Sequence, residues 1–103
     1  MVRFEKRLVF NNMIGNFACS TAGHDKGQIY VIIGESDGNV IVSDGRLKTV
    51  EKPKSKNSKH IQIIRKGCDI SLRDKILSGD KAVNEAIKRA IKLYKREEEN
   101  VKS

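Results

Sequence analysis

The residues with the clearest chemical potential are the basic side chains between positions 46 and 66. This 21-residue segment holds eight basic residues and one acidic residue, Glu51, for a net charge of +7. The other 82 residues hold 13 basic and 12 acidic side chains, so the surplus positive charge is confined to one segment. Because such a segment can neutralise phosphates, we expect it to bind a polyanion such as RNA; a solvated, mobile loop is the alternative. The expected phosphate contacts are Arg46, Lys48, Lys52, Lys54, Lys56, Lys59, Arg65 and Lys66.

A second candidate site is the polar run 20–27, in which two glycines four positions apart bracket His24, Asp25 and Lys26. Glycine permits the tight backbone of a loop tip. We expect His24 and Lys26 to reach the polyanionic partner from this tip. Since a carboxylate repels phosphate, Asp25 is expected instead to stabilise the turn by hydrogen bonds to backbone amides. His60 either stacks on a base or begins the last strand.

The same residue types do not indicate catalysis. Ser20, His24 and Asp25 are crowded into six positions, whereas a working triad needs groups that converge from separate segments. The glycine-bracketed loop lacks the Lys-Ser/Thr pair of a phosphate-binding loop. Cys19 and Cys68 form no CxxC pair and have no His/Cys cluster around them. We therefore expect no enzymatic activity, no metal and no cofactor, and two free thiols in a cytoplasmic protein, with a disulfide as the alternative.

The chain length of 103 residues fits a single domain. Residues 1–13 contain a short apolar run, residues 8–10, which is far below the roughly 7–15 residues of a signal peptide. No run approaches the ~18 apolar residues of a membrane span. We expect residues 1–13 to form a poorly ordered arm or a short extra strand.

Residues 14–66 have the pattern of a small β domain. Asp37-Gly38 and Asp44-Gly45 stand between apolar runs, and Asp-Gly is a strong hairpin signal. Pro53 is expected to end the pairing, followed by a polar loop at 54–59. The expected strands are about five: 16–19, 29–33, 40–42, 46–50 and 60–64. Five short strands with tight turns predict a small antiparallel SH3-like barrel over residues 14–67.

The expected strands are apolar on both faces, whereas a bare barrel needs apolar residues only inside. Residues 68–103 supply a cover. Ser71 to Asp74 resembles a capping box, Gly79 is expected to end the first helix, and Asp80 to cap a second that runs to about Glu98. This helix carries an apolar stripe that we expect to pack on the outside of the barrel: Val83, Ala86, Ile87, Ala90, Ile91 and Tyr94. Lys88, Lys92 and Lys95 are expected to form its solvated face.

Several of these features together resemble the KOW family, and more closely bacterial RNA-binding relatives of a large-subunit ribosomal protein of archaea and eukaryotes. The resemblance covers about residues 14–66. It is carried by the loop 20–27, the strand after it, Asp44-Gly45-Arg46, and the segment from Lys52-Pro53-Lys54 to Lys59-His60. It implies an SH3-like barrel that binds RNA, often ribosomal RNA. His24 stands where related sequences commonly have a basic residue, often Arg.

The leading hypothesis is therefore a cytoplasmic, monomeric RNA-binding protein that associates with the ribosome through structured ribosomal RNA of the large subunit. It would be a peripheral component or an assembly or translation factor, with ribosomal proteins as further partners and no membrane. The alternative is a KOW-type module that binds proteins in transcription or translation. RNA docking predicts release by salt or ribonuclease, whereas a hydrophobic protein interface should survive both.

Overall fold

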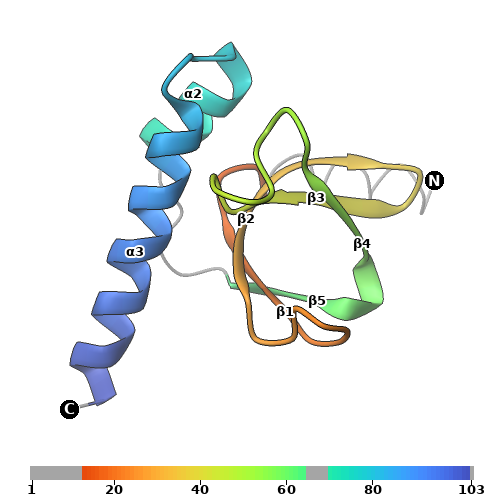
Figure 1. The fold of residues 1–103 in the computed structure, drawn as a ribbon, viewed down its shortest axis with the longest axis vertical. Helices are drawn as coiled ribbons and strands as arrows, with labels where there is room; N and C mark the ends of the chain where they lie inside the picture. Colours follow the sequence, from red (N-terminus) through yellow and green to blue (C-terminus); the bar gives the residue numbers. More distant parts are fainter. Residues whose placement is uncertain (1–12, 65–69, 103) are drawn as a thin grey trace.

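The computed structural model describes residues 13–64 and 70–102, and these form a small, mainly β domain with two helices (Figure 1). The expectations for the N-terminal arm, Arg65, Lys66 and Cys68 lie outside the described residues. Five strands form one antiparallel sheet in the order β4-β3-β2-β1-β5. The strands are β1 (Phe17–Ser20), β2 (Ile29–Ser36), β3 (Asn39–Ser43), β4 (Lys54–Asn57) and β5 (Ile61–Ile64).

The two edge strands, β4 and β5, are consecutive in the chain and are joined only by the 3₁₀ helix η1 (Ser58–His60). Across a flat sheet, four strand spacings would separate them by about 19 Å. Three residues of 3₁₀ helix span only about 6 Å. The sheet must therefore curl until its edges approach each other, and Figure 1 shows this curvature. An irregularity in the β2–β3 register between Ile32 and Gly34 assists the bend.

The curled sheet has an apolar cluster on each face. The inner cluster contains Ala18, Tyr30, Ile32, Val40, Val42 and Ile61. The outer cluster joins Phe17 and Val31 of the sheet to Leu72, Val83, Ile87 and Ile91 of the helices. Alternate residues of β2 thus enter different clusters, because successive side chains of a strand point to opposite faces. The expectation that the two-faced strands require a cover is confirmed.

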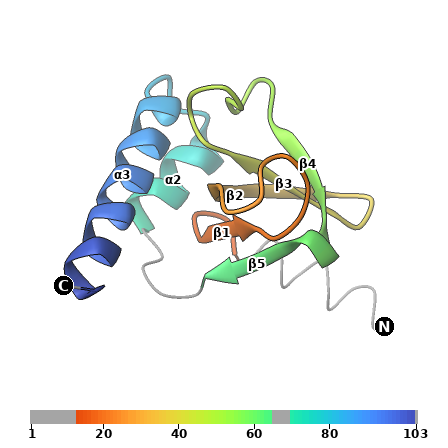
Figure 2. The ribbon, with the colours of Figure 1, turned by 60° about the horizontal axis from the view of Figure 1, so that its bottom comes forward.

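The cover is made by α2 (Ile70–Ser78) and α3 (Val83–Lys102), which lie on one side of the sheet (Figure 2). The apolar stripe of α3 faces the sheet as predicted, and Tyr94 stacks on Phe17 with ring centroids 4.8 Å apart. Full burial of each large apolar side chain contributes about 1.5–3 kcal/mol. The helices are therefore part of the core.

The helix ends follow the sequence signals in part. Gly79, at φ +70°, ends α2, and the Asp80 N–H donates to the Lys75 carbonyl, as in a Schellman motif. Asp80 Oδ1 accepts the Ala82 N–H at 2.7 Å and so caps α3 as predicted. Ser71 lies inside α2 and does not cap it. Helix α3 continues past Glu98, its predicted end, to Lys102. Among the described residues, neither helix has the length and apolarity that a membrane crossing requires.

Two strand predictions are wrong. Residues 46–50 do not pair as a strand but form a turn and loop, and residues 54–57, predicted as a polar loop, form β4. Strand β4 pairs with β3 from Asn39↔Asn57 to Val42↔Lys54. Pro53 thus precedes a strand and does not end one. The polar composition of β4 concealed it, because the one buried side chain of this strand is Lys56, which pairs with Asp25, and not an apolar residue.

Candidate nucleic-acid interface

The loop between β1 and β2 is anchored by the carboxylate of Asp25. Asp25 Oδ1 accepts hydrogen bonds from Ser20 Oγ and Lys56 Nζ, both at 2.9 Å, and Oδ2 accepts the Tyr30 hydroxyl at 2.7 Å. Lys54 Nζ lies 3.3 Å from Oδ2. The Asp25 side chain is only 15% exposed. The prediction that Asp25 stabilises the turn is confirmed, but the prediction that it does so through backbone amides is wrong. Its partners are side chains.

This environment changes the acidity of both members of the Asp25–Tyr30 pair. Burial alone would raise the pKa of Asp25, but the hydrogen bonds from Tyr30, Lys56, Ser20 and Lys54 outweigh it and hold that pKa well below its usual range. Burial, followed by the bond to the Asp25 carboxylate, raises the pKa of Tyr30 far above its usual range. At neutral pH the pair is therefore a carboxylate that accepts from a phenol.

The backbone of the loop is tied to both neighbouring elements. Gly27 N–H donates to the Ser20 carbonyl at 2.8 Å, and the Thr21 N–H donates to the His60 carbonyl of η1 at 3.0 Å. Gly23 and Gly27 have φ of +90° and +89°, in the region that side-chain-bearing residues adopt only with strain. The loop is thus a fixed platform beside η1 and β4.

Lys56 does not face solvent. Its side chain is 9% exposed, and its ammonium donates to the Ala22 carbonyl and to Asp25, both at 2.9 Å. A buried ammonium with a carboxylate partner is already neutralised and is not available to a phosphate. Lys54 is partly exposed and shares the same carboxylate. The sequence could not distinguish these two from their neighbours, because all lie in one run of alternating lysines.

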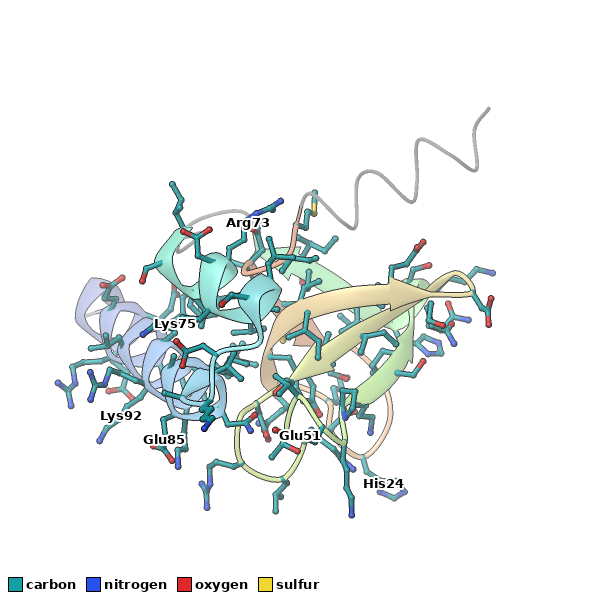
Figure 3. The ribbon with its side chains drawn as sticks, turned by 90° about the horizontal axis from the view of Figure 1, so that it is seen from above. His24, Glu51, Arg73, Lys75, Glu85 and Lys92 are labelled. Carbon is teal, nitrogen blue, oxygen red and sulfur yellow. The ribbon has the colours of Figure 1, made fainter. Side chains whose placement is uncertain are left out.

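The other described candidates are accessible, and the fold separates them into two groups. Beside the anchored loop lie the exposed side chains of His24, Lys26, Lys59 and His60. His60 belongs to η1 and does not begin β5. The second group, Arg46 and Lys48, lies in the turn after β3, and exposed Lys52 follows in the loop to β4. Figure 3 shows His24, Glu51 and Lys92 along the same side of the molecule, with Arg73 on the opposite side.

The turn after β3 is closed by short polar contacts. Asp44 Oδ1 accepts the N–H groups of Arg46 and Lys48 at 2.8 and 2.9 Å. Ser43 Oγ donates to the Lys48 carbonyl at 2.6 Å. These bonds satisfy the backbone locally and replace the ladder of the strand predicted at 46–50. Arg46 and Leu47 are thereby held at the tip of a defined turn.

This turn rests directly on α3. A side-chain carbon at Gly45 would overlap the Asn84 carbonyl oxygen and lie 3.0 Å from the Lys88 nitrogen. The Asn84 side chain extends the contact, accepting the Val50 N–H and donating to Glu51 Oε1, both at 2.9 Å. Glycine at position 45 therefore allows the turn to approach the helix backbone. The Asp44-Gly45 pair marks a docking point on a helix as well as a turn.

A cleft of about 520 Å³ opens between this turn and α3. The exposed arm of the turn contributes Arg46 and Leu47, and α3 contributes Lys88, Lys92 and Lys95. The sequence predicted these three lysines as a solvated helix face, but it did not predict that the turn after β3 lies beside them. Their spacing of four and three residues was visible in the sequence, but their approach to Arg46 depends on the docking of the turn.

The described residues contain no group of three or more His, Cys, Asp or Glu side chains that could hold a metal. Ser20 Oγ is within hydrogen-bonding distance of Asp25 Oδ1 and the Ala22 carbonyl, at 2.9 and 3.0 Å, whereas the side chain of His24 is exposed. The side-chain chemistry of the loop is therefore used to hold its shape.

In comparisons with known proteins, the chain matches no protein-family model and no curated protein.

Proposed function

We propose that this protein binds structured RNA through the face that carries the loop 20–27, η1 and the basic loops around them. The observation that carries the proposal is the position of the Asp25 carboxylate. This carboxylate contacts Ser20, Tyr30, Lys54 and Lys56, and the two lysines neutralise its charge. The loop therefore presents His24 and Lys26 to solvent without an exposed acid beside them. A fixed platform loses little conformational entropy when it binds.

The contacts to phosphate are supplied by the exposed cations of this face. Lys26, Lys52 and Lys59 are exposed, with Arg46 and Lys48 in the adjoining turn. Lys56 is excluded from this set because its ammonium is bound to Asp25. Such contacts position an RNA without reading its sequence. No aromatic platform for single-stranded bases is formed by the described residues, which favours a structured RNA.

The finer fold assignment and the biological setting rest on the resemblance to the KOW family. We infer that the curled sheet is a small SH3-like barrel, since its edges are joined by one short 3₁₀ turn. The resemblance assigns the KOW turn to the glycine-bracketed loop 20–27 between β1 and β2. On this basis the RNA is ribosomal RNA of the large subunit, and the protein is a peripheral component or an assembly or translation factor.

RNA binding is tested by titrating fluorescein-labelled ribosomal RNA fragments with the protein from 50 to 300 mM KCl. Neutralisation of about five phosphates predicts a slope of log affinity against log salt of roughly −3.5 to −4.5. The double variant Lys52→Gln/Lys59→Gln should bind at least tenfold more weakly with a shallower slope. Lys75→Gln/Lys81→Gln, with the same change of net charge on α2 and the turn after it, is the matched control. A slope near zero would contradict the proposal.

Association with the ribosome is tested by sedimenting a cell lysate on sucrose gradients at low and high salt. Cosedimentation with the large subunit at low salt, lost at high salt or after ribonuclease, is expected. Exposed Leu77 and Leu93 on the helices favour the alternative of a protein-binding module. Under that alternative, the protein stays with a protein partner at high salt and after ribonuclease treatment.

A further inference from the structure

The cleft between the turn after β3 and α3 has a chemical character that differs from the loop face. Its rim carries cations from two elements, Arg46 from the turn and Lys92 and Lys95 from the helix. Lys88 also lines it, but its ammonium is paired with Glu85 at 2.9 Å. Among the described residues, no ion pair occupies Arg46, Lys92 or Lys95. The cleft therefore attracts a negatively charged group.

An apolar surface lies between these cations. Leu47, at the tip of the turn, is 83% exposed, the highest value among the exposed large apolar side chains of the described residues. Ile91 forms part of the cleft floor, and Gln28 adds an amide with donor and acceptor groups. A ligand that suits this lining has an apolar part, hydrogen-bonding groups and a negative charge. These are the properties of a nucleotide.

The turn that presents Leu47 is held by hydrogen bonds and by close packing on α3 without any ligand. The carboxylate of Asp44, the acid of the cleft lining, accepts two backbone N–H groups through Oδ1 and so is engaged with its own turn. Gly45 seats the turn on the backbone of α3, and Asn84 holds the following residues. A turn fixed in this way keeps an apolar side chain exposed at a constant distance from the helix lysines. The volume of about 520 Å³ lies in the usual range of ligand clefts.

The cleft also adjoins the proposed RNA-binding face at Gln28. Gln28 in its lining follows the loop 20–27 directly, and its N–H donates to the Asp25 carbonyl at 2.8 Å. Lys92 lies on the same side of the molecule as His24 (Figure 3). An RNA docked on the loop can therefore extend to the cleft.

We propose that this cleft receives an unpaired nucleotide of the bound RNA, with its base against Leu47 and its phosphates on Arg46, Lys92 and Lys95. The inference rests on the proposed RNA binding and adds to it a preference for one kind of RNA structure. The loop face contacts the backbone of a stem, and the cleft selects a stem that carries a bulged or flipped-out nucleotide. Unpaired nucleotides are the usual targets of selective RNA recognition, because their bases are free to contact a protein.

The test compares two fluorescein-labelled RNA hairpins of equal length, one fully paired and one with a single-nucleotide bulge. Wild-type protein should bind the bulged hairpin about tenfold more tightly, the effect expected for burial of one large apolar side chain. Leu47→Ala should bring the two affinities together, and Lys92→Gln/Lys95→Gln should do the same. Lys52→Gln/Lys59→Gln should weaken binding of both hairpins and keep their ratio. Because Leu47, Lys92 and Lys95 are exposed, these variants should keep the wild-type urea midpoint.

The outcomes separate the two proposals. If wild-type protein binds neither these hairpins nor the ribosomal RNA fragments, RNA binding itself is refuted. If it binds both hairpins equally, or if Leu47→Ala keeps the preference for the bulge, the assignment of the cleft is overturned while RNA binding stands. Displacement of the bulged hairpin by poly-glutamate at equal charge would assign the cleft to an acidic protein surface, and would also overturn it.

Discussion

The loop 20–27 and the loop that begins at Asp44 both follow a strand, contain glycine and carry basic side chains, but they are held in different ways. The first is anchored from within the sheet, by a carboxylate that binds side chains of β1, β2 and β4. The second is closed by its own polar groups and then rests on a helix that lies 34 residues away in sequence. The charge of the first loop is partly neutralised by ion pairs within the domain. The second loop leaves Arg46 and Lys48 exposed.

The difference shows that positive charge in a sequence does not measure the charge available to a partner. Lys56 and Lys59 stand three positions apart, yet one is buried on Asp25 and the other is exposed. The internal pair stabilises the platform from which the exposed cations project. Variants that separate these two roles test the comparison most directly.

The largest effect is expected from Gly45→Ala compared with Gly27→Ala. Both glycines have positive φ, so both substitutions strain the backbone. The new methyl group at 45 also overlaps the α3 backbone, whereas at 27 it meets no atom within 4 Å. Gly45→Ala should therefore lower the free energy of unfolding by about 3–5 kcal/mol, and Gly27→Ala by about 1–2 kcal/mol. Urea denaturation followed by circular dichroism measures both, and equal losses would show that the turn is not tightly seated on α3.

The second effect is expected from Asp25→Asn, which preserves shape but removes the charge. It leaves the Lys56 ammonium buried without a counter-ion, so we expect a loss of roughly 2–3 kcal/mol at pH 7. Asp74→Asn, the same change at an exposed position of α2, should leave the urea midpoint nearly unchanged. If both variants lose the same stability, Asp25 does not anchor the loop.

The Asp25 effect must also depend on pH. Its pKa in the folded protein lies below the usual range of an aspartate, so the folded state binds this proton less readily than the unfolded state. The stabilisation is then complete above the unfolded pKa and is lost as pH falls through that value toward the folded one. The difference in urea midpoint between wild type and Asp25→Asn should be constant from pH 7 to about 5 and shrink below that. A difference that stays constant to pH 3 would contradict this account.

The smallest effect on stability is expected from Asn84→Ala, which removes the acceptor of the Val50 N–H. The loss of one partly buried hydrogen bond should cost about 1 kcal/mol. Glu51→Gln is the control: it alters the other end of the Asn84 side-chain contact and keeps the Val50 bond, so its urea midpoint should stay near wild type. Since Asn84 positions the loop and does not line the cleft, its variant should reduce the preference for bulged RNA and keep binding to the paired hairpin.

The chain by itself specified the periodic parts of the molecule. Apolar alternation placed β1, β2 and β3 within a few residues, and helical spacing located α3 and the stripe that packs on the sheet. Turn and cap residues such as Gly79 and Asp80 were also readable, because their effects depend on neighbours in sequence. The concentration of charge between residues 46 and 66 followed from composition, and the loop tip at 20–27 from the spacing of its two glycines around polar residues.

The tertiary structure decided where β4 forms and which basic side chains remain accessible to a partner. Strand β4 has no apolar alternation, because its one buried side chain is Lys56, and it forms by pairing with β3 at the edge of the sheet. Lys56 is buried because the curl of the sheet brings β4 under Asp25, and Arg46 faces Lys92 because Gly45 seats its turn on α3. These contacts join residues about 30 to 50 positions apart, whose approach depends on sheet curvature and helix docking. Local sequence records the types of these residues, but only the packed fold determines whether each charge is used inside the protein or offered to a partner.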